Sequence, residues 1–501
     1  MSIYGEFFTK FMEPLFEGFV SIFTGIGEGL FQMFNIMNYV TVISDYKNDL
    51  TGAGVAIMIL SIIFLLAIFG IIIFLIARSI KIYVRYRRNV KKEDMLIEEI
   101  DSLNNEIFKL KRQNAKFSEI TNEAGEIEYN EDGSVKNELK EGDSRFFKLS
   151  NVDEDFEEKT LEEINNNFTL NEFCEMFRNY SASKLNLYYD IKLIRLFVAS
   201  LASNKLIILE GISGTGKTSL AYAFGSFVDN ETTVASVQPS WRDSTEIFGY
   251  FNEFTKKFNE TAILEKMYEA QYTDEVYTTL LDEMNISRVE YYFAEMLSIL
   301  ELPNKKDWVI ELVPNVWPND PIKLDEGKLK IPENMWYIGT INNDDSTFMI
   351  TDKVYDRAMP IAIDDKCEVF AAPDTDKVKT SYKYLDSLFD KSSIEHPVLD
   401  ETLEKITQLD RYVIDHFRLA FGNRIVKQLK DFVPAYVACG GDEIEAIDYL
   451  IAHKILRKFE QLNLAYIKDE IDGLINYLEK LFGVGKTPEC KAYLLRLKKT
   501  I

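Results

Sequence analysis

The chain has 501 residues, which is enough for two or more folded units together with accessory segments. Its formal net charge of −24 argues against a surface that coats nucleic acid, because such binding depends on lysine and arginine contacts to phosphates. Direct nucleic-acid binding is therefore not indicated. The cysteines and histidines lie scattered without metal-ligand spacing, so we expect no zinc site and a reducing compartment.

The N-terminal part of the chain contains a candidate membrane span. Residues 1–50 are rich in phenylalanine at near-helical spacing and predict an amphipathic extracytoplasmic segment. Residues 51–80 follow as a predicted transmembrane helix, because 52–77 hold 26 residues without a charge, and about 20 apolar helical residues cross a bilayer core. A buried core helix is the alternative, although core helices rarely run so long without a polar face.

Charges on the two sides of residues 52–77 predict its orientation. Residues 1–51 carry two lysines against six acids, whereas seven basic residues and no acid occur in 78–92. Positive flanks stay on the cytoplasmic side, so we expect a single-pass protein of the cell membrane with its N-terminus outside.

Two connecting segments follow the basic flank. Residues 81–118 predict a short coiled coil, with an amphipathic helix packed on its own protein as the alternative. Residues 119–160 are predicted to form an acidic linker, because 118–163 carry 16 acids against 5 bases. We expect the globular part to begin at about 161, with a nucleotide-binding domain over 161–395 and a helical lid with C-terminal helices over 396–501.

The strongest motif follows the apolar run 206–209 and fills the template Gly-x4-Gly-Lys-Ser/Thr. In this motif the glycines let backbone N–H groups face a phosphate chain, the lysine reaches the β- and γ-phosphates, and the following threonine ligates Mg²⁺. A Gly-rich turn that happens to hold a lysine is the alternative. The residues of this candidate nucleotide site are Gly211, Ile212, Ser213, Gly214, Thr215, Gly216, Lys217, Thr218 and Ser219.

Two further apolar runs end in polar residues that suit the same chemistry. Residues 276–281 precede Asp282 and Glu283, and residues 335–341 precede Asn342. We expect Asp282 to hold Mg²⁺ together with Thr218, Glu283 to polarise the attacking water, and Asn342 to orient that water. An Asp-Glu pair at a solvated strand end is common by itself, but three strand ends of this kind in this order are not.

These motifs resemble AAA+ ATPases of the dynein-related and McrB-like branch over about residues 185–465. The matching stretches are the P-loop, 281–301, 339–345, 352–358 and, less specifically, 241–252. The resemblance implies an α/β fold in which a parallel sheet lies between helices and a helical lid follows. It places Asp282 and Glu283 on the Walker B pair, Asn342 on sensor 1, and Arg357 on the arginine that completes a neighbouring subunit's site. A salt bridge of Arg357 with Asp352 or Asp356 is the alternative.

The resemblance also implies a lid arginine and an oligomer. Arg424 falls roughly where an arginine of the lid approaches the nucleotide, and a trans-acting Arg357 requires a homo-oligomeric ring, with a hexamer expected. We expect lid helices near 403–421, 424–438, 443–463 and 468–482, with Asp442 as a cap after Gly440-Gly441.

The function implied is that of an ATPase that uses ATP and Mg²⁺ to remodel or translocate a substrate, as the motor of an anti-phage defence system with a separately encoded effector. GTP stays open, because 341–345 keep the spacing of the Met-Asn-x-x-Asp signature of McrB but not its methionine. A nucleotide-switched membrane scaffold and a MoxR-like chaperone are the alternatives.

Overall fold

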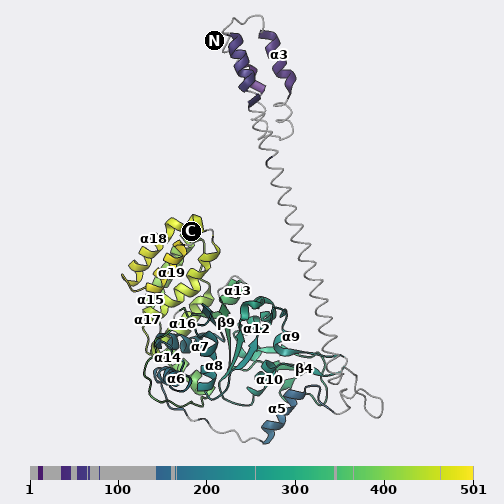
Figure 1. The fold of residues 1–501 in the computed structure, drawn as a ribbon, viewed down its shortest axis with the longest axis vertical. Helices are drawn as coiled ribbons and strands as arrows, with labels where there is room; N and C mark the ends of the chain where they lie inside the picture. The colour runs from purple at the N-terminus through teal and green to yellow at the C-terminus, as the bar shows by residue number, and fades with distance from the viewer. Residues whose placement is uncertain are drawn as a thin grey trace. The chain divides into compact units, whose positions relative to one another are not determined.

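The computed structural model describes residues 10–14, 35–46, 54–64, 66–67, 78, 143–158, 164, 166–253, 255–342, 347–364, 366–462 and 464–499. The chain divides into two units, Met1–Lys136 and Asn137–Ile501. Both units are drawn in Figure 1.

In the first unit, helix α3 (Ile36–Tyr46) packs Tyr39 against Phe11 and Met12, with the rings of Phe11 and Tyr39 edge to face at 5.7 Å. Among the described residues of the chain, no helix has both the length and the apolar character needed to cross a membrane. Of the expected span 52–77, residues 54–64 and 66–67 are helical, and the remainder lies outside the described residues. The expected coiled coil at 81–118 lies wholly outside them.

The second unit begins earlier than the sequence predicts. Residues of the expected acidic linker form helix α5 (Phe147–Glu158), and Phe146, Leu149 and Val152 are buried in the core. The Glu260 carboxylate accepts hydrogen bonds from the N–H groups of Lys148 and Leu149 at 2.8 and 2.9 Å and thereby satisfies two unpaired donors of the first turn. The prediction of a linker was based on the number of acidic residues. It did not take account of these three apolar residues, which recur every third position as in a helix.

The centre of the second unit is a parallel five-stranded sheet in the order β10-β1-β9-β5-β2. Two antiparallel sheets, β3-β4 and β6-β8-β7, are inserted in the connections. The strands are β1 (Leu206–Gly211), β2 (Thr233–Ser236), β3 (Gly249–Phe251), β4 (Phe258–Glu260), β5 (Tyr277–Asp282), β6 (Val309–Glu311), β7 (Leu324–Asp325), β8 (Lys328–Lys330), β9 (Met335–Asn342) and β10 (Ala358–Ala362).

Helices cover both faces of this sheet (Figure 1). Alternate strand residues point to opposite sides, so Ile207 and Ile338 join one core cluster while Ile208 and Tyr337 join the other. The first cluster contains α6 (Leu170–Leu185), α7 (Ile191–Ser203), α8 (Lys217–Phe227), α14 (Tyr382–Glu395) and α16 (Asn423–Ala438). The second contains α5, α9 (Thr245–Phe248), α10 (Ala262–Glu269), α11 (Val289–Tyr292), α12 (Ala294–Ile299) and α13 (Asp352–Tyr355). The sequence prediction of an α/β fold with a parallel sheet between helices is confirmed at this level.

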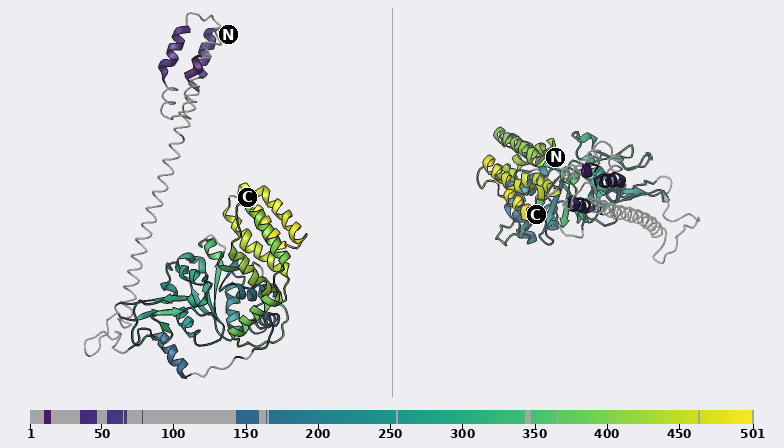
Figure 2. Two further views of the ribbon diagram at one scale, coloured as in Figure 1. Left: turned by 180° about the vertical axis from the view of Figure 1, so that it is seen from behind. Right: turned by 90° about the horizontal axis from the view of Figure 1, so that it is seen from above.

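The C-terminal part is helical, as the sequence predicts, and its helices group together in green and yellow in both views of Figure 2. Besides α16, it contains α15 (Asp400–Phe417), α17 (Glu443–Leu450), a π-helical turn η3 (Ile451–Ile455), a 3₁₀ turn η4 (Leu456–Gln461), α18 (Leu464–Phe482) and α19 (Pro488–Lys499). The expected cap is confirmed, because the Asp442 carboxylate accepts from the N–H groups of Ile444 and Glu445.

Candidate nucleotide-hydrolysis site

The P-loop connects β1 to α8 and depends on three glycines with positive φ. Gly211, Gly214 and Gly216 have φ of 146°, 78° and 98°, a region that L side chains rarely adopt. A Cβ on Gly211 would also lie 2.3 Å from the carbonyl oxygen of Ile363. The first turn of α8 starts at Lys217, so its unpaired N–H groups and the positive end of its dipole face the loop.

The side chain of Lys217 folds back over this loop. It is 5 % exposed, and its Nζ donates to the carbonyl oxygens of Gly211 and Ile212 at 3.0 and 2.7 Å. From the connection between α6 and α7, the Tyr189 hydroxyl donates to the Gly216 carbonyl oxygen at 3.3 Å. Burial raises the pKa of this tyrosine, so it remains a neutral donor. The loop is thus held in shape from both sides.

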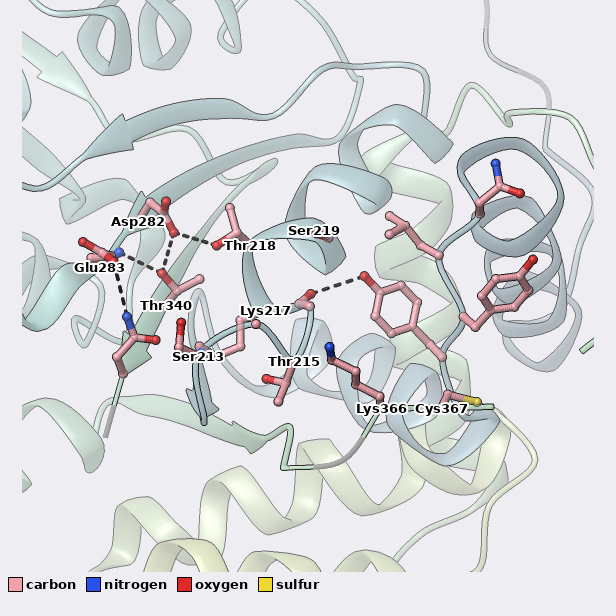
Figure 3. A pocket seen from close by; sticks show the side chains of 17 residues that line it. Ser213, Thr215, Lys217, Thr218, Ser219, Asp282, Glu283, Thr340, Lys366 and Cys367 are labelled. Atoms are coloured by element: carbon pink, nitrogen blue, oxygen red, sulfur yellow. Dashed lines mark hydrogen bonds between the residues drawn. The ribbon is translucent and has the colours of Figure 1, made fainter. Parts of the chain in front are cut away.

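The acidic strand end of β5 lies directly opposite the start of α8 (Figure 3). Thr218 Oγ1 donates to Asp282 Oδ1 at 2.8 Å, and Thr340 Oγ1 donates to the same oxygen at 2.7 Å. The Thr340 hydroxyl also accepts from the backbone N–H of Glu283 at 2.8 Å. One buried threonine of β9 therefore orients both members of the acidic pair.

Glu283 and Asn342 meet at the same edge of the sheet. Asn342 Nδ2 donates to Glu283 Oε1 at 3.3 Å. Glu283 has φ 53° and ψ 46°, a left-handed conformation that is uncommon for a residue with a Cβ and that occurs often at functional sites. The strand order explains the meeting, because β9 lies between β1 and β5 and brings Asn342 between the P-loop and the acidic pair.

The structure therefore brings most of the predicted site residues together. They line a cavity of about 440 Å³, into which Ser213–Ser219, Asp282, Glu283 and Asn342 all contribute. The Thr218 hydroxyl and the Asp282 carboxylate fit the requirements of Mg²⁺, which takes oxygen ligands and uses one or two carboxylates beside substrate phosphates. When bound, the ion would neutralise phosphate charge at this point.

The far side of the cavity contains residues that carry no motif in the sequence. Asn186, Tyr188, Tyr189, Lys366 and Cys367 line it, and the last four also line an adjoining cavity of about 710 Å³. Arg496 of α19 lines this second cavity. Both cavities therefore open beside the P-loop residue Thr215, which lines each of them.

Arg357 lies at the opposite end of the sheet. It precedes β10, whose first residue Ala358 pairs with Leu206 at the start of β1, whereas the P-loop begins at Gly211. Five strand steps separate the two ends by roughly 17 Å. The guanidinium Nε is 2.6 Å from Glu301 Oε2, so the ion pair is formed with Glu301 and not with Asp352 or Asp356.

The sequence predicts that Arg424 approaches the nucleotide, but the structure does not place this residue beside its own chain's P-loop. Arg424 lies in the first turn of α16, pairs with Glu301, and lines a cavity of about 310 Å³ together with Arg357. It is therefore at the amino end of the strands, away from its own chain's P-loop. The sequence placed Arg424 in the lid but could not show which end of the sheet the start of α16 covers.

Two other residues of the site were not predicted from the sequence. Thr340 shares a strand face with Asn342, and polar residues two positions apart on a buried strand were the available signal. Asn285 Nδ2 donates to the carbonyl oxygen of Asn342 and to Thr347 Oγ1 at 3.1 and 2.9 Å, so one side chain bonds both residues.

Comparisons with known proteins add little to this geometry. No protein-family model matches the chain, and no curated protein matches it. Among solved structures that match is a full-length MCM homologue from Methanopyrus kandleri, at 11 % identity and a TM-score of 0.32. The match covers 58 % of this chain and 61 % of that one, so this chain spans less than two thirds of the homologue's length. A likeness at this level does not identify a family.

Proposed function

We propose that the chain is an AAA+ NTPase that hydrolyses ATP with Mg²⁺. The observation that carries this proposal is the connected set of hydrogen bonds from Thr218 through Asp282 and Thr340 to Glu283 and Asn342, which lies beside a glycine-rich phosphate loop. Nucleotide binding by itself does not require a carboxylate held by an amide beside the γ-phosphate position. Hydrolysis does, because a water must be aligned and must lose a proton.

Each residue has a separate task in this reaction. The P-loop N–H groups and Lys217 hold the phosphates, while Thr218 and Asp282 would hold Mg²⁺. Glu283 accepts a proton from the attacking water, and Asn342 orients both that carboxylate and the water. The left-handed backbone of Glu283 and the bond from its N–H group to Thr340 set the direction of this carboxylate before substrate binds.

The proposed active assembly is a homo-oligomeric ring, with six subunits expected. The position of Arg357 supports this, because a residue about 17 Å from its own P-loop reaches a nucleotide only in another subunit. Arg357 would then leave Glu301 for the neighbour's γ-phosphate and stabilise charge in the transition state.

The cellular setting is proposed from the sequence. A single-pass anchor at residues 52–77, with the N-terminus outside, would place the NTPase at the cytoplasmic face of the cell membrane. In the described piece of this segment, Ile59, Leu60 and Phe64 are 51 %, 65 % and 54 % exposed, as expected of side chains that face lipid. The McrB-like resemblance supports a motor for a separately encoded effector in anti-phage defence, and GTP remains the alternative substrate.

A nucleotide-regulated scaffold is the second candidate, because the exposed apolar segment near the N-terminus favours a role in assembly at a membrane. In such a switch, binding and release would drive the change of state. Glu283 and its bond to Asn342 would then have no chemical task.

The variant Glu283→Gln tests the proposal and separates the two candidates. Glutamine keeps the size and the oxygen that accepts from Asn342 but is no base, so nucleotide should bind normally and phosphate release should fall at least roughly tenfold. Glu295→Gln, on the exposed side of α12, is the matched control and should turn over as the parent does. Undiminished phosphate release by Glu283→Gln would refute the assignment of the base.

A further inference from the structure

Lys454 is a buried lysine in the lid, and it is not among the described residues that line the cavity beside the P-loop. It lies in the π-helical turn η3 and is 3 % exposed. Its Nζ donates to the carbonyl oxygens of Tyr355 and Ala358, both at 2.6 Å, and to that of Asp356 at 3.4 Å. Placing an amine in an apolar interior is costly, so a lysine is retained there only when its donors are used.

The three carbonyl groups belong to the residues on either side of Arg357. The N–H groups of Tyr355, Asp356 and Arg357 form local bonds to the carbonyl oxygens of Thr351, Asp352 and Val354. Two further bonds come from distant parts of the chain: Gln428 donates to the Asp356 carbonyl oxygen at 3.1 Å, and Asn204 donates to that of Arg357 at 2.9 Å. Asp356 and Arg357 connect α13, which ends at Tyr355, to β10, which begins at Ala358. Lys454 therefore supplies the two short bonds that bracket Arg357 in the chain.

The form of the helix explains how Lys454 reaches this position. A π-helical turn carries an extra residue and often occurs at functional sites, and here it follows the regular helix α17. One turn further on, Arg457 Nη1 lies 2.7 Å from Glu210 Oε2, and Glu210 immediately precedes Gly211 of the P-loop. The same lid segment thus contacts both the P-loop strand and the segment that carries Arg357.

We propose that Lys454 is a positioning residue that holds Arg357 in the place from which it enters the neighbouring subunit's site. This rests on the proposed trans role of Arg357 and adds the lid element that presents it. Burial lowers the pKa of Lys454 to about 7. An ammonium has three donors and a neutral amine two, so both short bonds to Tyr355 and Ala358 persist in either protonation state.

The test uses complementation between subunits of the full-length protein. Lys454→Met keeps the length of the side chain and removes its donors, so its own P-loop should bind nucleotide normally while homogeneous rings lose at least roughly tenfold in turnover. When Lys454→Met subunits are mixed with Lys217→Ala subunits, turnover should recover. In such rings the intact P-loop of a Lys454→Met subunit faces the intact Arg357 of a Lys217→Ala subunit. Mixed with Arg357→Ala, Lys454→Met should stay inactive, because neither subunit presents the arginine.

Lys491→Met in α19, where the lysine forms an exposed pair with Glu479, is the matched control and should retain full turnover. Lys454→Gln, whose amide nitrogen lies one bond closer to the main chain than the lysine Nζ and so falls short of both carbonyl oxygens, replaces Lys454→Met if the latter does not fold, with the same expected outcomes. The proposal would be overturned if Lys454→Met alone showed normal turnover. It would also be overturned if Lys454→Met regained turnover when mixed with Arg357→Ala, or if it failed to regain turnover when mixed with Lys217→Ala although the two were shown to co-assemble. If Arg357→Ala rings are themselves fully active, the trans role of Arg357 fails instead.

Discussion

The hydroxyl of Thr340 offers the sharpest test of how the acidic pair is held. It is 2 % exposed, donates to Asp282 Oδ1 at 2.7 Å, and accepts from the Glu283 N–H at 2.8 Å. Thr340→Val replaces this hydroxyl by a methyl group of similar size, so packing is preserved while both bonds are lost.

The expected loss of turnover follows from the charge of the Asp282 carboxylate that accepts the hydrogen bond. A hydrogen bond to a charged group contributes about 1.5–3 kcal/mol, more than the roughly 1 kcal/mol of a neutral pair. If that bond orients Asp282 and Glu283 in the transition state, its loss lowers turnover roughly 10- to 150-fold, since about 1.4 kcal/mol corresponds to a factor of ten. Nucleotide affinity should change little, because the P-loop contacts are untouched.

Phosphate release at saturating nucleotide, measured over a range of Mg²⁺ concentrations, gives the readout. The matched control is Thr279→Val on the neighbouring strand β5, where the threonine is equally buried but its hydroxyl contacts only the Met335 sulfur, at 3.7 Å. The control should turn over within about twofold of the parent. An equal loss in both variants, or a Thr340→Val protein with normal turnover, would refute the reasoning.

Three further outcomes are expected. Lys217→Ala should abolish nucleotide binding in an equilibrium assay with a fluorescent analogue, because it removes the charge that faces the β- and γ-phosphates; retained affinity would contradict the P-loop assignment. A cysteine at Ser2 should react with an impermeant thiol reagent in intact cells and one at Ser118 should not, and labelling of both or neither would contradict the proposed topology. Gly339→Ala should lower the melting temperature, since its Cβ would lie 1.9 Å from Met284 Sδ and overpacking costs about 1–3 kcal/mol, whereas Gly422→Ala, with no atom within 4 Å, should change it little.

Local patterns predicted the centre of the fold well. The apolar runs before Gly211, Asp282 and Asn342 are the strands β1, β5 and β9, and the Asp442 cap forms as expected. Strands and helix caps depend on residues that are close in the sequence, so a local sequence pattern is enough to predict them. The meeting of Asn342 with Glu283 depends on strand order, which periodicity does not contain. The resemblance assigned both residues to one site without giving that order.

Features that depend on contacts between distant parts of the chain could not be predicted from local sequence patterns. Net charge over residues 119–160 indicated a solvated linker, yet α5 buries Leu149 and Val152 because Glu260 satisfies its first turn from more than a hundred residues away. The partner of Arg357 is Glu301, which no local pattern identifies, and the position of Arg424 depends on which end of the sheet α16 covers.

The separation between the P-loop and Arg357 has a consequence for regulation. In an isolated chain, both Arg357 and Arg424 are paired with Glu301, so neither guanidinium is available to its own nucleotide. Under the proposed trans role, a neighbour's γ-phosphate would compete with Glu301 for Arg357, while Lys454 would keep the backbone of that segment in place. Since only assembly brings a phosphate to this face, hydrolysis should depend on oligomer formation even when every subunit is saturated with nucleotide.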